Sequence, residues 1–154
     1  MTKWLVLSGL IVAADQLAKY AAVRGLAGGA IEVTPFFNLV LAYNAGAAFS
    51  ILSDAAGWQR GLFIAIALIA SAWVLSLLSK YAYQRLFALA LSLVLAGAVG
   101  NVIDRIRIGV VIDFLDFHAL GYHWPAFNVA DSAITCGAVL LVWDALRPRA
   151  RAEG

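Results

Sequence analysis

The chain contains 154 residues, of which 64% are hydrophobic and only 13% are charged. Because soluble domains are about half apolar and about one quarter charged, this composition excludes an ordinary soluble domain and predicts an integral membrane protein. The formal net charge of +2 does not favour nucleic-acid binding, and a single cysteine excludes an internal disulfide framework.

The first predicted element is a membrane-spanning helix over about residues 4–24. Its second half contains Asp15 and Lys19, which lie one helical turn apart and therefore share a face. Taken alone, these two residues are typical of an intrahelical ion pair that stabilises the fold.

The loop over about residues 25–60 is rich in Val, Phe, Leu and Tyr, and it is interrupted by Pro35 and Gly46. β-Branched and aromatic residues favour strands, whereas Pro and Gly mark turns. We therefore expect this loop to form short strands at the membrane surface, and not a fifth span.

Three further spans are predicted over about residues 61–79, 86–104 and 126–146. Each approaches the roughly 20 residues that a helix needs to cross the bilayer core. A second loop, over about residues 105–125, precedes the last span, and its Pro125 is expected to start the last helix.

The third span ends in the motif GAVGNVIDR, which combines polar and small residues. Asn101, Asp104 and Arg105 share one helical face, and Gly97 and Gly100 would let another helix approach closely. An isolated pair of Asp104 and Arg105 would be read as boundary residues that reach water. The alternative is that Asn101, Asp104 and Arg105 form a polar stripe along one face of the helix.

The last span begins with a second polar stripe, formed by Asn128, Asp131, Ser132 and Thr135. Ser132 and Thr135 are explained if they bond to backbone carbonyls one turn earlier. Asp131 is different, because no cation lies one turn away from it in its own helix. An ionisable residue in a span indicates a functional site.

Cationic residues near the ends of the spans predict the orientation of the chain. Six of them would lie on one side: Lys3, Lys80, Arg85, Arg147, Arg149 and Arg151. Four would lie on the other: Arg24, Arg60, Arg105 and Arg107. This bias predicts that both termini are cytoplasmic and that the polar stripes lie near the extracytoplasmic surface.

The second loop contains Asp113 and Asp116 in an apolar, β-prone stretch. If this loop folds back over the start of the last span, one of the two carboxylates meets Asp131. Two carboxylates in one low-dielectric site share a proton, so that one acts as a base toward water and the other as an acid toward a carbonyl. This is the chemistry of an aspartic peptidase, and the residues by themselves leave open which loop carboxylate takes part.

Five blocks in the chain resemble the lipoprotein signal peptidase (signal peptidase II) family, the intramembrane aspartic peptidases of bacteria. They are DQLAK (Asp15 to Lys19), NAGAAF (Asn44 to Phe49), GAVGNVIDR (Gly97 to Arg105), VIDF (Val111 to Phe114) and FNVADS (Phe127 to Ser132). The resemblance implies an integral membrane protein that is mainly α-helical. Four transmembrane helices and a small extracytoplasmic β-rich loop region would form one membrane-embedded peptidase domain over residues 1–154, in the bacterial inner membrane.

The resemblance also assigns roles to residues. It implies that Asp113 and Asp131 form the catalytic pair, which selects Asp113 over Asp116. Asn101, Arg105 and Asn128 match residues that support the pair or the substrate. Asn44 and Gly46 match the loop that lines the peptide site. Asp15 and Lys19 match structural or positioning groups. No metal or cofactor is expected.

The implied substrate is a prolipoprotein whose cysteine carries a diacylglyceryl group, and the cut falls on the amino side of that cysteine. Membrane lipids are the other expected partners, nucleic acid is not a partner, and the chain is expected to be a monomer.

Two other functions fit parts of the pattern. A small proton-coupled transporter or channel would use the span residues Asp15, Lys19, Asp104 and Asp131 as a relay, but no inverted repeat is found and the polar groups cluster on one side. A metallopeptidase would use His118 and His123, but these do not share a helical face and no HExxH motif is present. A passive scaffold would leave Asp131 unexplained.

Overall fold

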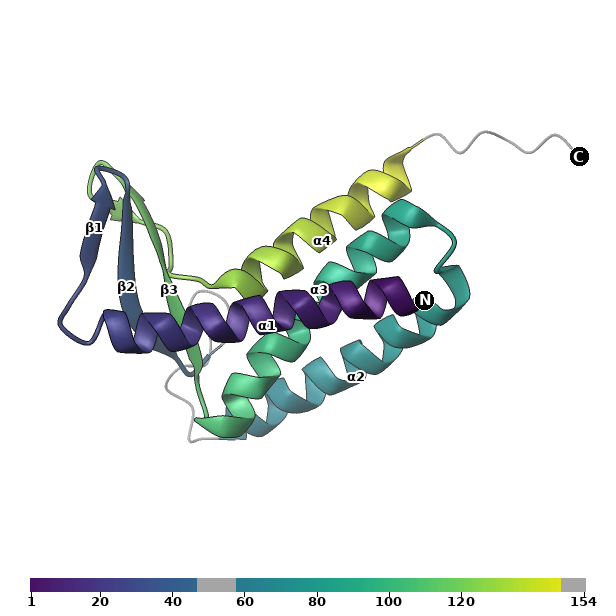
Figure 1. Cartoon of the computed structure of the whole chain (residues 1–154), viewed down its shortest axis with the longest axis horizontal. Coiled ribbons are helices and arrows are strands. Elements are labelled where there is room, and N and C mark those ends of the chain that lie inside the picture. The colour runs from purple at the N-terminus through teal and green to yellow at the C-terminus, as the bar shows by residue number, and fades with distance from the viewer. Residues whose placement is uncertain (47–57, 148–154) are drawn as a thin grey trace, which may run out of the picture.

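The computed structural model describes residues 1–46 and 58–147. In this part of the chain, long helices form a bundle, and a four-stranded antiparallel sheet lies at one end of it (Figure 1). The N-terminus and the last turn of the final helix lie at the end away from the sheet (Figure 1). The sheet therefore covers only one end of the bundle.

The helices are α1 (Thr2–Gly25), α2 (Trp58–Tyr81), α3 (Arg85–Arg107) and α4 (Val129–Leu146). All four are long and apolar enough to cross a membrane, which confirms the predicted spans. α3 packs against each of the other three helices and is the most buried of them.

The predicted boundaries of these spans differ from the structure by up to three residues. The last helix begins at Val129 and not near Ala126, so the expectation that Pro125 starts it is wrong. Asn128 caps this helix instead, because its side-chain oxygen accepts a hydrogen bond from the backbone N–H of Asp131. α3 continues to Arg107, one turn beyond the predicted end of the third span.

Gly97 and Gly100 allow α3 to approach its neighbours closely. A Cβ atom on Gly97 would overlap the carbonyl oxygen of Ala130 in α4, and one on Gly100 would lie 2.8 Å from the Oδ2 atom of Asp15 in α1. Both contacts are shorter than a real Cβ atom tolerates. The close approach expected at these glycines is therefore confirmed, and it brings α1, α3 and α4 together at the level of their polar residues.

Gly97→Ala is expected to destabilise the protein by about 1 to 3 kcal/mol, because the added methyl group meets the backbone of α4, which cannot move without displacing the helix. Thermal unfolding in detergent measures the loss. Gly9→Ala in α1 is the matched control, since a Cβ atom there meets nothing within 4 Å. Equal unfolding temperatures for the two variants would contradict this account of the α3–α4 contact.

The sheet combines the two loops that the sequence predicts to be rich in strands. Its strands are β1 (Ile31–Thr34), β2 (Phe37–Asn44), β3 (Val111–Ala119) and β4 (Tyr122–His123), in the order β1-β2-β3-β4. The central pair, β2 and β3, joins the first loop to the second, and Ala42 lies opposite Asp113. This register places the end of β2 next to the start of β3.

The segment between β4 and α4 returns along β3. The backbone of Phe127 donates to the carbonyl of Leu115 and accepts from its N–H, at 3.1 Å and 2.9 Å. Because Asn128 follows directly, this bridge places the start of α4 beside β3. The second loop therefore folds back over the start of the last helix, which is the arrangement that lets one of its carboxylates meet Asp131.

Candidate active site

The candidate site lies where β3 meets the first turn of α4, and Asn128 connects its two carboxylates. The Asn128 amide donates to the Oδ1 atom of Asp113 at 2.7 Å, and its Oδ1 atom accepts from the backbone N–H of Asp131 at 2.9 Å. The Oδ2 atom of Asp131 accepts in turn from the backbone N–H of Asn128 at 3.3 Å. The residue that caps α4 thus also holds both carboxylates in place.

Asp131 is held by a neutral partner in α3. Its Oδ1 atom accepts a hydrogen bond of 2.7 Å from the side-chain amide of Asn101. Within residues 1–46 and 58–147, no cationic side chain forms an ion pair with Asp131. Ser132 donates to the carbonyl of Asn128 at 2.9 Å, which confirms the backbone role considered for that hydroxyl.

The Asn101 amide can point in only one direction. Its Oδ1 atom accepts from the Nζ atom of Lys19 at 3.1 Å and from the Asn128 amide at 3.3 Å. Because Lys19 is a donor and cannot accept, the oxygen of Asn101 must face it, and the NH₂ group must face Asp131. Lys19 therefore orients the group that holds Asp131.

Lys19 lies at the centre of a buried charge cluster. Its Nζ atom is 2.8 Å from Asp15 and 2.7 Å from Asp104, and its side chain is only 2% exposed. Asp15 also accepts from the backbone N–H of Ala130 in α4, and Asp104 accepts from that of Ile112 in β3. The cluster therefore joins α1, α3, α4 and β3 at one point.

This cluster decides between the alternatives that the sequence left open. Asp104 is 3% exposed and paired with Lys19, so it belongs to a polar stripe and is not a boundary residue that reaches water. Asp15 and Lys19 do form the predicted intrahelical pair, but both also bond to other elements. Asp15 and Lys19 therefore stabilise the tertiary structure, because they connect different helices.

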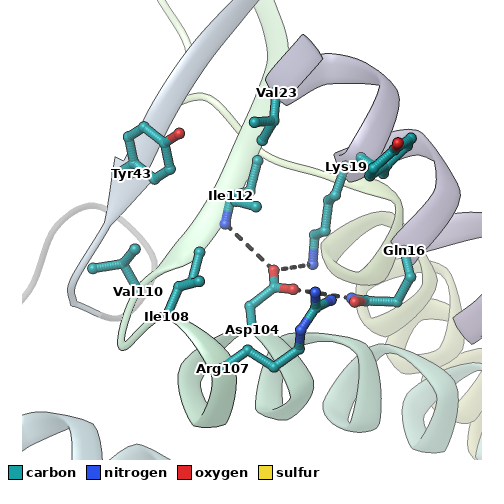
Figure 2. A pocket seen from close by; sticks show the side chains of 10 residues that line it. Gln16, Lys19, Val23, Tyr43, Asp104, Arg107, Ile108, Val110 and Ile112 are labelled. Carbon is teal, nitrogen blue, oxygen red and sulfur yellow. Dashed lines mark hydrogen bonds and ion pairs between the residues drawn. The ribbon is translucent and has the colours of Figure 1, made fainter.

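Gln16 belongs to the same cluster, although it was not among the candidate residues predicted from the sequence. Its side-chain amide donates to Asp104 at 3.0 Å, to Asp15 at 3.2 Å and to the carbonyl of Gly100 at 3.3 Å. Figure 2 shows Gln16 and Lys19 pointing at Asp104 from the same helix. An amide beside an aspartate inside a predicted span was the signal that could have identified it.

The end of β2 supplies the second partner of Asp113. Asn44 donates to its Oδ2 atom at 3.1 Å and accepts from the N–H of Gly46 at 2.9 Å. The guanidinium of Arg105 donates to the carbonyl of Gly46 at 2.9 Å and lies over the ring of Phe63. The rest of the NAGAAF block, residues 47–49, lies outside the described residues. The nine residues implied by the resemblance thus belong to one connected region.

The pKa of Asp113 is raised from its ordinary value of 3.8 to about 6. Burial is the main cause, because the carboxyl is 2% exposed and its charged form loses solvation. The negative charge of Asp131 raises the pKa further, and the hydrogen bonds from Asn44 and Asn128 partly offset both effects. Asp113 therefore retains its proton at a pH where an ordinary aspartate has lost it.

Asp116 is not part of this region. Its carboxylate accepts from Asn38 at 3.2 Å and lies 2.9 Å from the Nδ1 atom of His123. Because successive side chains of a strand point to opposite faces, Asp116 and Asp113 face different sides of β3. His118 and His123 stack on each other, and the described residues contain no group of three or more potential metal ligands.

The sequence matches the family described as Signal peptidase (SPase) II over residues 7–147. The protein called lipoprotein signal peptidase in Burkholderia thailandensis is 54% identical over 148 residues, which are 96% of this chain and 89% of the relative. The protein with the same name in Burkholderia multivorans is 55% identical, with the same coverage.

Two solved structures of bacterial membrane enzymes, determined by the in meso method, share the fold. The structure at 2.3 Å resolution has a TM-score of 0.85 and 35% identity, and it covers 95% of this chain and 88% of its own. The structure at 1.9 Å resolution has a TM-score of 0.84 and 34% identity, and it covers 97% and 96%. The chain, a multi-pass bacterial membrane protein, therefore belongs to the signal peptidase II family of peptidases.

Proposed function

We propose that this chain removes signal peptides from diacylglyceryl-modified prolipoproteins and that Asp113 and Asp131 are its catalytic pair. One observation carries the proposal: in a chain of the signal peptidase II family, Asn128 holds these two carboxylates next to each other. The matched relatives are named lipoprotein signal peptidases, and no comparison supports the transporter or channel alternative.

The proposed reaction uses the two carboxyl groups in different protonation states. Asp131 takes a proton from water, and the resulting hydroxide attacks the scissile carbonyl carbon while Asp113 donates its proton to the carbonyl oxygen. When the tetrahedral intermediate collapses, Asp131 passes its proton to the leaving amine, and Asp113 takes back the proton of the hydroxyl group. Asn101 and Asn128 keep the two carboxyls oriented throughout.

The proposed position in the membrane follows from the charge bias of the loops. Both termini would be cytoplasmic, and the sheet and the two carboxylates would lie near the extracytoplasmic face. A cysteine anchored by its acyl chains would then present the peptide bond on its amino side at the depth of Asp113 and Asp131. The protein would act as a monomer with one membrane-embedded peptidase domain.

Cleavage is expected to decline as the pH rises above about 6, because Asp113 must carry the proton that it donates and its pKa is about 6. At low pH, cleavage is expected to decline as well, because Asp131 then also carries a proton and cannot act as a base. The rising and falling limbs of the pH profile report the pKa values of the coupled pair, and not those of either residue alone. The measurement is kcat/KM against pH, with a diacylglyceryl-modified prolipoprotein in liposomes.

Two controls belong to this experiment. The same precursor without the diacylglyceryl group should remain uncut at every pH, and Asp116→Asn should leave the shape of the profile unchanged. A flat profile would overturn the shared-proton mechanism. Equal cleavage of the modified and unmodified precursors would overturn the proposed substrate.

A further inference from the structure

A cavity of about 470 Å³ lies on the other side of β3 from the two carboxylates. α1, the end of α3, β2 and β3 surround it (Figure 2). Ile112 lines the cavity, whereas the neighbouring residue Asp113 faces Asn128, because successive side chains of a strand point to opposite faces. Asn101 and Asp131 do not line it. The cavity therefore does not contain the two carboxylates, although Lys19 and Asp104 of the buried charge cluster line it.

The base and the rim of the cavity differ in chemistry. At the base, Asp104 pairs with Lys19 and accepts a hydrogen bond from the Gln16 amide, so the two charges there are already paired. At the rim, Arg107 is exposed and forms no ion pair with any described residue. The rest of the lining is two tyrosines and four aliphatic residues: Tyr20, Tyr43, Val23, Ile108, Val110 and Ile112.

The cavity lies at the sheet end of two candidate membrane spans, where the proposed orientation would place lipid headgroups. Arg107 is the last residue of α3, and Tyr20 lies in the last turns of α1, at the sheet end of two spans. Leu17 and Ile106, which belong to the same ends of these helices, are 69% and 55% exposed, as expected for side chains that face acyl chains. Tyrosine is enriched at this depth in membrane proteins.

We propose that this cavity binds a membrane phospholipid, with the phosphate group at Arg107 and the acyl chains against the aliphatic wall. A guanidinium can donate two parallel hydrogen bonds to a phosphate. Free phosphate would leave the aliphatic residues uncovered, whereas a cationic ligand would meet Arg107 and find Asp104 already paired with Lys19. A phospholipid satisfies both parts of the lining.

A bound phospholipid would contact α1, α3, β2 and β3 together. These elements also carry Lys19, Asp104 and Asn44, so the lipid would stabilise the region that supports the two carboxylates without touching them. Binding only to the folded chain raises its unfolding temperature. The inference does not depend on the proposed peptidase function, since it concerns another face of β3.

The test is thermal unfolding of the delipidated chain in detergent while phosphatidylglycerol is added. The unfolding temperature is expected to rise with a saturable midpoint, and Arg107→Gln is expected to move that midpoint about tenfold higher because a charge-assisted hydrogen bond is lost. Ile108→Trp, which fills the cavity and keeps the charge, should weaken the response as well. Arg85→Gln is the matched control, since Arg85 is an exposed arginine at the other end of α3.

Three results would overturn the proposal. An equal response of Arg107→Gln and the unchanged chain would show that the lipid acts elsewhere. An equal response to diacylglycerol, which lacks the phosphate, would show that the stabilisation comes only from covering apolar surface. An equal response to inorganic phosphate would identify a site for the free anion and not for a lipid.

Discussion

Asp113→Asn and Asp131→Asn, made separately, are each expected to lower kcat for signal-peptide cleavage by roughly 10²- to 10⁴-fold, the usual contribution of a general acid or base. Asparagine keeps the shape of the side chain but cannot take up or release the proton. Cleavage of a diacylglyceryl-modified prolipoprotein in liposomes measures the effect. Asp116→Asn is the matched control, because Asp116 is a buried aspartate on the opposite face of the same strand.

The unfolding temperature separates a chemical role of Asp113 from a structural one. Its pKa is about 6 in the folded chain and about 3.8 when unfolded, so the folded state binds the proton more tightly. The stability from this group is present below the unfolded pKa and is lost as the pH rises through about 6. At neutral pH, Asp113→Asn removes an unfavourable buried charge, and its unfolding temperature should not decrease. A large decrease would indicate that lost activity reflects lost structure.

The outcome for Asp131 answers a separate question. Asp131→Asn should remain folded, because the cap of α4 depends mainly on the oxygen of Asn128, which accepts from the backbone N–H of residue 131. If this variant still cuts the substrate, Asp131 serves only as part of the capping box, and the proposed reaction is wrong. If Asp116→Asn also loses activity, the choice of Asp113 as its partner is wrong.

Lys19→Met is expected to destabilise the chain by about 3 to 5 kcal/mol, because Asp15 and Asp104 would then be buried without a cation. It should also reduce cleavage, since the oxygen of Asn101 loses the donor that orients its amide toward Asp131. Thermal unfolding in detergent and the cleavage assay measure the two effects.

Two matched variants test this explanation of Lys19. Lys80→Met removes an exposed lysine at the end of α2 and should change neither quantity. Lys19→Met combined with Asp104→Asn should recover part of the lost stability, because one of the two unpaired carboxylates is then neutral. If Lys19→Met unfolds at the same temperature as Lys80→Met, the buried cluster does not hold the bundle together.

The four spans and the strand-rich loops follow from the sequence alone. Hydropathy and the helical period are local properties, so a stretch long enough to cross the bilayer can be recognised without its neighbours. The same period places Asn101 and Asp104 on one face of α3, and it predicts that Asn128 and Asp131 lie close together at the start of the last span. The resemblance then selects Asp113, a choice that periodicity could not make.

The contacts between these elements depend on long-range pairing. Asp15 bonds to the backbone of Ala130 across 115 positions of the chain, and Asn44 bonds to Asp113 across 69. No local pattern indicates that Asp104 is buried against Lys19 or that Gln16 bridges two aspartates. The cap of α4 at Asn128 did have a local signal, because Asn is a preferred N-cap residue and an acidic residue follows three positions later.

There is a physical reason why the sequence determines the spans but not the contacts between them. Burial in lipid favours helices of sufficient length whatever they pack against, so the sequence by itself determines the spans and the faces that carry polar residues. The partner of each polar residue is determined only when the β2–β3 register and the close approach at Gly97 place specific donors and acceptors within hydrogen-bonding distance. The tertiary structure alone therefore decided that Asn128 joins Asp113 to Asp131 and that Lys19 orients Asn101.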